Sequence, residues 1–106
     1  MEGDPILVVV KGPVGLGSYQ LDRRLLVIGR DSGADLVFES EHISRRHLEI
    51  STSGGSVSVR DLDSTNGSSL NGKPLGSSLT PLSIGDHIGL ADDLVILRLQ
   101  ESGSTV

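Results

Sequence analysis

The chain contains no cysteine and no tryptophan, and apart from histidine its aromatic side chains are one phenylalanine and one tyrosine. The absence of cysteine excludes disulfides, thiolate metal ligands and a cysteine nucleophile, and it fits a reducing compartment. An aromatic cage or a platform for stacking bases needs several rings, so the sequence argues against both. Leucine, isoleucine and valine must therefore fill the core.

Long apolar runs are also lacking, and none approaches the ~20 residues that a transmembrane helix needs. Residues 1–4 lack the basic start of a signal peptide. The net charge of −5, from 14 acidic and 9 basic residues, disfavours nucleic acid and anionic membranes as partners, because both attract cationic surfaces. We therefore expect an intracellular, cytoplasmic protein that binds neither nucleic acid nor membrane.

Short runs of β-branched residues and leucine, separated by turn residues, make up most of the chain. The 14 glycines and 4 prolines are spread widely, and no window of about 11 residues keeps a helical apolar period. The strand-like runs lie at residues 6–10, 24–28, 36–38, 47–51, 56–60, 87–90 and 94–99. Roughly eight to eleven short strands with frequent turns are typical of one all-β sandwich or barrel.

Glycine-containing segments mark the expected turns and loops. Ser53-Gly54-Gly55 separates two alternating runs and predicts a hairpin, and Asn66-Gly67 and Asn71-Gly72 predict two further tight turns, since Gly and Asn tolerate positive φ. A loop is expected over residues 12–17. We expect an N-terminal extension at residues 1–4, the domain at residues 5–99, and a flexible tail or linker start at residues 100–106.

Polar residues that suit an anion gather in three loops, at residues 29–35, 42–47 and 61–72. Three arginines and two histidines lie between Arg30 and His47, in a protein that is acidic overall. Guanidinium groups, hydroxyls and backbone N–H groups are the donors that a phosphate dianion needs. Ser44 and Thr65 offer hydroxyls, and Asn66 offers both a donor and an acceptor for the backbone of an extended peptide.

The order and spacing of these residues resemble the signature of the forkhead-associated (FHA) domain family. The signature consists of Gly29-Arg30, Ser44-x-x-His47 and Asn66-Gly67, and further similar segments extend the likeness over about residues 5–99. The resemblance implies an eleven-stranded β-sandwich of two twisted, mostly antiparallel sheets with the ligand loops at one end. It also implies a module of Ser/Thr kinase signalling that binds phosphothreonine in preference to phosphoserine.

The resemblance implies which residues would contact the ligand. Arg30 and Ser44 would bind the phosphate directly, and Thr65 would be an additional phosphate ligand. Arg45 follows the phosphate-binding serine and would face the phosphate or the peptide. Asn66 would hold the peptide backbone.

Four other residues in or beside these motifs are expected to play a supporting or neutral part. Gly29 would permit the turn before Arg30, and Gly67 would permit the turn after Asn66. His47 would brace the loops by hydrogen bonding. Arg46 is expected to be structural or solvated, because adjacent residues of an extended segment point to opposite sides.

Other readings of these residues stay open. An isolated arginine is commonly a solvated surface charge, and Asn66-Gly67 is also a plain hairpin turn. Asp92 and Asp93 lie between the last two expected strands, where they could meet a basic or polar ligand residue or form a solvated turn. The alternative function is a phosphate-independent protein-interaction or dimerisation module on the same scaffold.

The sequence contains no assembled catalytic or metal-binding motif. Ser44 and His47 lack a Gly-x-Ser-x-Gly elbow, and the three histidines lack metal spacing. The segment at residues 61–72 departs from a calcium loop at Asn66 and Gly72. We therefore expect no enzymatic activity, no cofactor and no metal, and a domain that is part of a larger multidomain signalling protein.

Overall fold

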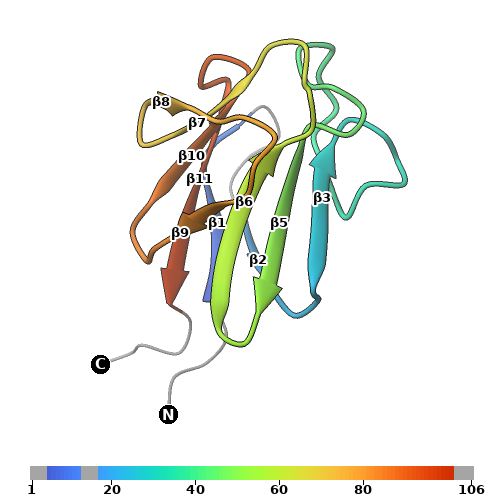
Figure 1. Ribbon diagram of the computed structural model, residues 1–106. Helices are drawn as coiled ribbons and strands as arrows, with labels where there is room; N and C mark the ends of the chain where they lie inside the picture. Colours follow the sequence, from blue (N-terminus) through green and yellow to red (C-terminus); the bar gives the residue numbers. More distant parts are fainter. Residues whose placement is uncertain (1–4, 13–16, 102–106) are drawn as a thin grey trace.

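The computed structural model of the chain describes residues 5–12 and 17–101. The expected extension at residues 1–4, residues 13–16 of the expected loop, and residues 102–106 of the expected tail lie outside the described residues. The described chain forms eleven strands in two sheets that pack face to face (Figure 1). This architecture confirms the expected eleven-stranded sandwich.

The two sheets have six and five strands. Their strand orders are β2-β1-β11-β10-β7-β8 and β4-β3-β5-β6-β9. The strands are β1 (Pro5–Lys11), β2 (Ser18–Gln20), β3 (Leu25–Gly29), β4 (Leu36–Val37), β5 (Leu48–Ser53), β6 (Ser56–Asp61), β7 (Ser68–Leu70), β8 (Lys73–Pro74), β9 (Thr80–Leu82), β10 (His87–Leu90) and β11 (Val95–Glu101). Within the described chain only β3 and β4 pair in parallel, so the sheets are mostly antiparallel, as expected.

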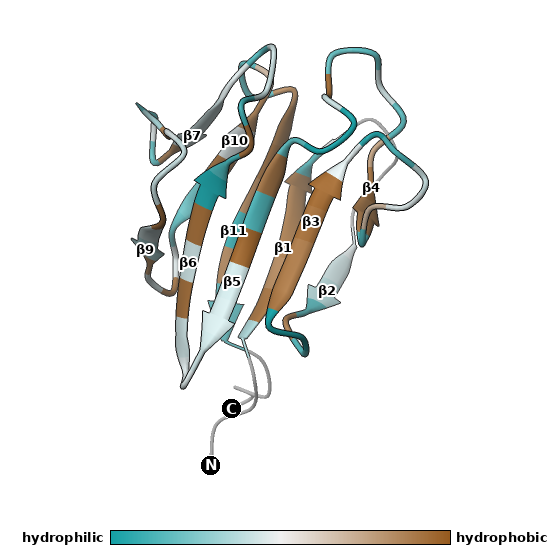
Figure 2. Cartoon of the chain, turned by 45° about the vertical axis from the view of Figure 1, so that its right-hand side comes forward, coloured by the Kyte–Doolittle hydropathy of each residue, from teal (hydrophilic) through white to brown (hydrophobic). Residues whose placement is uncertain are grey.

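The core lies between the sheets and consists almost entirely of aliphatic side chains. Strand β6 alternates between buried Val57 and Val59 and more exposed polar residues, and β11 follows the same period of two through buried Leu97 and Leu99. Phe38 is the one aromatic residue of this core cluster. Figure 2 shows the hydrophobic residues on the strands and the hydrophilic ones mainly in the connecting loops.

The seven strands expected from the sequence are all present, with ends shifted by two residues at most. Strand β11 continues through Glu101, so Gln100 and Glu101 lie in a strand although the sequence placed them in the tail. The sequence reading did not assign β2, β7, β8 and β9, which have only two or three residues each. Strands β8 and β9 contain Pro74 and Pro81 and lie at sheet edges, where a missing N–H is tolerated.

The turns place the polar loops at one end of the sandwich. Gly54 and Gly55 have φ of 57° and 87° and connect β5 to β6, as a two-residue hairpin with positive φ requires. In Figure 1 that hairpin is at the lower end, whereas the chain after β3, before β5 and after β6 lies at the upper end. No helix in residues 5–12 and 17–101 is long and apolar enough to cross a membrane.

Candidate functional site

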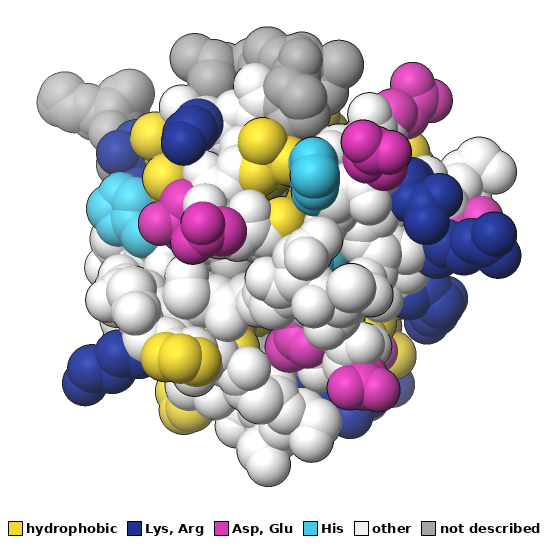
Figure 3. Space-filling view, turned by 90° about the horizontal axis from the view of Figure 1, so that it is seen from above, with side chains coloured by type: hydrophobic (Ala, Val, Ile, Leu, Met, Phe, Trp, Pro, Cys, Tyr) yellow, Lys and Arg dark blue, Asp and Glu magenta, His cyan; other side chains and the backbone are white. Residues whose placement is uncertain are grey.

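A polar recess of about 370 Å³ lies at the loop end of the sandwich. Its lining residues are Arg30, Glu41, His42, Ile43, Ser44, Arg45, Arg46, Thr65 and Asn66. Seen from the loop end, Lys and Arg side chains gather toward the right-hand edge, on the side where β3 lies in Figure 1 (Figure 3). The structure therefore brings together the five side chains expected to contact the ligand, from three segments far apart in the sequence.

Gly29, the last residue of β3, allows two of these segments to touch. A Cβ atom on Gly29 would lie 2.0 Å from the backbone oxygen of Arg45, so only glycine fits this close approach. The next two residues bond to the same segment, with Arg30 N donating to Ser44 O at 2.9 Å and Asp31 N donating to Arg45 O at 3.2 Å. The end of β3 thus fixes the segment that precedes β5.

The Arg30 side chain is held at its base and open at its tip. Its Nε donates to the carbonyl oxygen of Ile43 at 2.9 Å. Among residues 5–12 and 17–101 the two Nη atoms have no hydrogen-bond partner, and Arg30 is exposed. A guanidinium fixed through Nε presents a two-pronged donor to an oxyanion with little further loss of rotamer freedom.

His47 is fully buried and joins two loops. Ser44 N donates to His47 Nδ1 at 3.0 Å, and His47 Nε2 lies 2.8 Å from the carbonyl oxygen of Gly67. A backbone N–H can only donate, so Nδ1 accepts and the proton lies on Nε2 in a neutral ring. Gly67, with φ of 81°, continues the loop into β7 in a conformation that favours glycine.

Two further hydrogen bonds connect the loop after β6 to the segment before β5. Thr65 N donates to Ser44 Oγ at 3.0 Å, and Asn66 Nδ2 donates to His42 O at 2.8 Å. Because Ser44 Oγ accepts here, its own proton can be donated into the recess. Asn66 likewise keeps its Oδ1 and a second amide proton for a ligand backbone.

Arg45 and Arg46 both line the recess, although the sequence reading expected only Arg45 to do so. Neither of them, nor Arg30, has a carboxylate within 4.0 Å among the described residues, although Glu41 lines the same recess. The ion pairs in the described part of the chain are Arg23–Asp35 and Arg60–Glu49. The recess therefore carries three guanidinium groups that form no ion pair within the described part of the chain.

The sequence reading missed Asp61, which stabilises the loop carrying Thr65 and Asn66. Its carboxylate accepts hydrogen bonds from Ser64 N, Ser64 Oγ and Ser68 Oγ, at 2.8, 2.6 and 2.5 Å. Burial acts to raise the pKa of Asp61, but these hydrogen bonds outweigh it and hold the pKa below its ordinary value. The Asp-x-x-Ser spacing, which allows local side-chain capping of a turn, was the available signal.

Asn71 has a larger structural role than that of the plain turn residue which the sequence suggested. Its Nδ2 donates to Asp86 Oδ1 at 3.0 Å, and its Oδ1 accepts from His87 N at 2.9 Å. The hydrogen bonds from Asn71 and from Ser83 N hold the pKa of Asp86 below its ordinary value. Asn71 therefore connects the β7–β8 turn to the start of β10.

Two more recesses meet the first one at Asn66. One, of about 410 Å³, includes Lys11, Leu94 and Asp92 in its lining, and the other, of about 420 Å³, includes both Asp92 and Asp93. The Asp93 Oδ1 atom lies 1.9 Å from the position that a Cβ atom on Gly89 would occupy. The three arginines thus lie in the recess on one side of Asn66, and Asp92 and Asp93 lie together in a recess on its other side.

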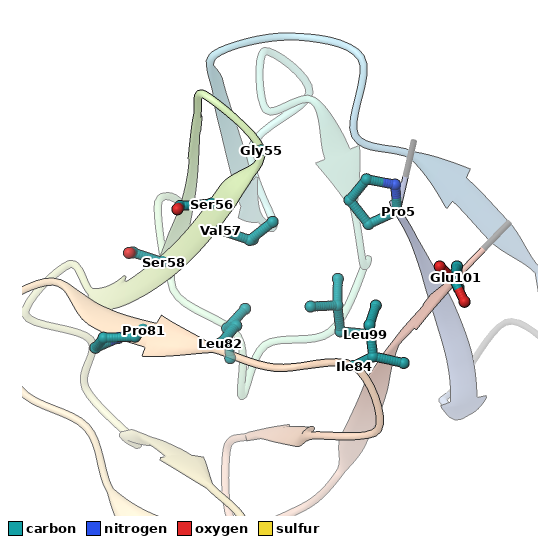
Figure 4. Close-up of a pocket in the computed structure, with 10 residues that line it drawn as sticks. All are labelled: Pro5, Gly55, Ser56, Val57, Ser58, Pro81, Leu82, Ile84, Leu99 and Glu101. Atoms are coloured by element: carbon teal, nitrogen blue, oxygen red, sulfur yellow. The ribbon is translucent and has the colours of Figure 1, made fainter. Parts of the chain in front are cut away.

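A larger recess, of about 600 Å³, lies away from these loops. In Figure 4, Val57, Leu82, Ile84 and Leu99 point into it from two facing sheets and the turn after β9, and Pro5 and Glu101 stand at its rim. None of the described residues that line it is a lysine, arginine or histidine, so its chemistry does not suit an anion. The described residues contain no cluster of three or more His, Cys, Asp or Glu side chains suited to a metal ion.

The comparisons with known proteins all indicate the same family. A family model described as FHA domain matches residues 26–91. An oxoglutarate dehydrogenase inhibitor of Corynebacterium jeikeium is 37% identical over 82% of this chain and 59% of its own length. The glycogen accumulation regulator GarA of Mycolicibacterium smegmatis is 34% identical over 81% of this chain and 53% of its own length. The chain thus spans little more than half the length of these relatives.

Solved structures agree with the family model. The FhaA FHA domain, crystallised in a complex with the intracellular domain of Rv3910, has a TM-score of 0.79 and 31% identity, covering 92% of this chain and 100% of that one. A second structure, from work on phosphothreonine-dependent FHA domain interactions, also has a TM-score of 0.79 and 31% identity, covering 92% of this chain and 96% of that one.

Proposed function

The chain belongs to the forkhead-associated (FHA) domain family, and we propose that its loop-end recess reversibly binds phosphothreonine-containing segments of other proteins. The observation that carries this proposal is the Arg30 guanidinium, fixed through Nε to Ile43 with its Nη atoms open beside Ser44. A related structure from work on phosphothreonine-dependent FHA domain interactions supports the same ligand class.

The donors of the recess match the chemistry of a phosphate monoester. Arg30 supplies a bidentate fork, Ser44 and Thr65 supply hydroxyls, and Arg45 supplies a second guanidinium near the phosphate. Each charge-assisted hydrogen bond contributes roughly 1.5–3 kcal/mol net. Two or three of them would favour a phosphorylated peptide over its unmodified copy by a factor of about 10³.

Asn66 would bind the backbone of the peptide. Its amide is already oriented by the hydrogen bond to His42 O, so binding costs little ordering of this side chain. Selectivity for phosphothreonine over phosphoserine would require contact with the threonine methyl group, as the family resemblance implies. A titration with matched phosphothreonine and phosphoserine peptides checks this point, and equal affinities would contradict it.

Binding, and not hydrolysis, is the function that the geometry supports. A hydrolase would need a base at Ser44 Oγ, but both ring nitrogens of His47 are engaged, by Ser44 N and by Gly67 O. Ser44 Oγ instead accepts from Thr65 N. Relatives named as an inhibitor and a regulator fit a role in which the bound protein is controlled by the interaction.

The intracellular location and the place of this domain in a larger signalling protein stay predictions. Phosphothreonine is produced by kinases, so the proposal places the domain where kinase products occur. Immunolocalisation and the size of the native polypeptide on a denaturing gel would test these two points separately.

Substitution of Arg30 tests the assignment directly. Arg30→Ala should reduce the affinity for the phosphopeptide to that of the unphosphorylated copy, while the melting temperature changes little because Arg30 is exposed. Arg24→Ala is a matched control, because it removes the same charge from an exposed residue that lies outside the recess. An Arg30→Ala variant that keeps the wild-type preference for the phosphopeptide would exclude this site.

The peptide for this test can come from an oriented library with a fixed phosphothreonine. Such a screen also separates the proposal from the alternative of a phosphate-independent interaction module. Enrichment only when the threonine is phosphorylated supports the proposal. Equal enrichment of the phosphorylated and unphosphorylated libraries supports the alternative.

A further inference from the structure

A buried carboxylate lies beneath the loop that carries Thr65 and Asn66. Asp61, the last residue of β6, is 8% exposed. Its Oδ2 accepts from Ser64 N at 2.8 Å, and its Oδ1 accepts from Ser64 Oγ at 2.6 Å. Ser64 is therefore attached to Asp61 through both its backbone and its side chain, and it directly precedes Thr65.

The Ser64 hydroxyl continues the connection toward the recess. After donating to Asp61, Ser64 Oγ accepts from Gly67 N at 3.0 Å. The carbonyl oxygen of Gly67 is bonded to His47 Nε2 at 2.8 Å, and His47 Nδ1 accepts from Ser44 N at 3.0 Å. Hydrogen bonds and the Gly67 backbone thus connect the Asp61 carboxylate to the backbone of Ser44, an expected phosphate ligand.

A second branch closes this chain into a ring. Thr65 N, directly after Ser64, donates to Ser44 Oγ at 3.0 Å. The loop at residues 64–67 is consequently held to Ser44 directly at Thr65 and through His47 at Gly67. Ser64 is the one residue in this loop that also bonds to Asp61. Losing the Ser64 hydroxyl would free the Gly67 N–H and loosen the loop from β6 without removing any side chain that lines the recess.

From this geometry we propose that Asp61 and Ser64 are positioning residues of the phosphopeptide site, which set the Thr65–Asn66 loop against Ser44 before the ligand binds. The inference rests on the proposed function, because it concerns affinity for the same ligand. A carboxylate suits this position since it accepts all three surrounding donors. An Asp61→Asn variant would instead turn an amide NH₂ toward at least one of those donors.

Ser68 provides a matched control for the loss of a hydrogen bond to Asp61. Its hydroxyl also donates to Asp61 Oδ1, and Ser68 is more deeply buried than Ser64, but it lies outside the chain that leads to Ser44. A merely structural role of Asp61 predicts that Ser64→Ala and Ser68→Ala lower stability and affinity in parallel. The positioning role predicts that only Ser64→Ala lowers the affinity.

The experiment measures the melting temperature and the dissociation constant for the library-selected phosphothreonine peptide. We expect Ser64→Ala to weaken binding about tenfold, the effect of one lost hydrogen bond, and Ser64→Thr, which keeps the hydroxyl, to restore it. Ser68→Ala should leave the affinity near that of the wild type. Asp61→Asn, which keeps the side-chain volume, should weaken binding as well and serves as the second variant if Ser64→Ala folds poorly.

Two outcomes would overturn the inference: equal affinity losses in Ser64→Ala and Ser68→Ala, or wild-type affinity in both Ser64→Ala and Asp61→Asn. The Arg30→Ala variant, titrated alongside, keeps the proposals separate. If Arg30→Ala abolishes the preference for the phosphopeptide but Ser64→Ala does not change affinity, only the positioning role fails. If Arg30→Ala keeps the preference, the proposed function fails.

Discussion

Replacing Gly29 with alanine would place a methyl group where the backbone carbonyl of Arg45 now lies. The new Cβ would be 2.0 Å from Arg45 O, 2.7 Å from Arg45 C and 3.0 Å from Ser44 O. All three atoms belong to the backbone, which cannot rotate away as a flexible side chain could. The segment before β5 would therefore have to separate from the end of β3.

The cost follows from what that separation breaks. Two backbone hydrogen bonds, Arg30 N to Ser44 O and Asp31 N to Arg45 O, contribute roughly 0.5–1.5 kcal/mol each. Forcing an extra methyl group into packed surroundings adds about 1–3 kcal/mol. The sum of about 2–6 kcal/mol is a large part of the roughly 5–15 kcal/mol that stabilises a domain, and it corresponds to a melting temperature lower by at least roughly 10 °C.

Thermal unfolding followed by circular dichroism measures this loss. Gly76→Ala is the matched control, because no atom lies within 4 Å of a Cβ at Gly76 and its φ is not in the left-handed region. That control should unfold within a few degrees of the wild type. If Gly29→Ala were as stable as Gly76→Ala, the close approach between β3 and the Arg45 carbonyl would not exist as described.

Other consequences can be measured with the same protein. His47→Ala should lower the free energy of unfolding by about 3 kcal/mol, because it leaves the part-buried Ser44 N–H and Gly67 carbonyl without their hydrogen-bond partner. An unchanged urea midpoint would contradict this. The lowered pKa values of Asp61 and Asp86 mean that both carboxylates contribute stability above their unfolded pKa of about 4 and lose it as the pH falls through the folded pKa. Stability should therefore decline below about pH 4, and less steeply in Asp86→Asn; equal slopes in urea titrations at several pH values would refute the assignment. Phosphopeptide affinity should fall as the pH drops below about 6, where phosphate loses a charge, and calorimetry at several pH values checks this. If Asp92 faces a basic ligand residue, Asp92→Lys should remove any enrichment of Lys and Arg in the library screen, and an unchanged profile would exclude that contact.

The sequence predicted those parts of the fold in which local pattern and tertiary packing agree. Runs such as residues 56–60 alternate with period two because one face of β6 packs in the core. The Gly54-Gly55 turn could be predicted because glycine adopts positive φ at little cost. Strands β2, β7, β8 and β9 are too short to show a period, and pairing with neighbours distant in the sequence defines them.

The candidate site was predictable in composition but not in its connections. Arg30, Ser44, Thr65 and Asn66 stand out as donors in an acidic chain, and the spacing of the signature suggested that they meet. The structural role of Asp61 depends on hydrogen bonds within a folded loop. The structural role of Asn71 depends on the approach of β10. Neither interaction leaves a periodic signal in the sequence.

The central claim is that the loop-end recess distinguishes a phosphorylated threonine from an unmodified one. The most direct measurement is a calorimetric titration of the wild-type protein with the library-selected peptide, once with phosphothreonine and once with threonine. The account predicts binding of the phosphorylated copy that is about 10³-fold tighter. Equal dissociation constants for the two copies would contradict it.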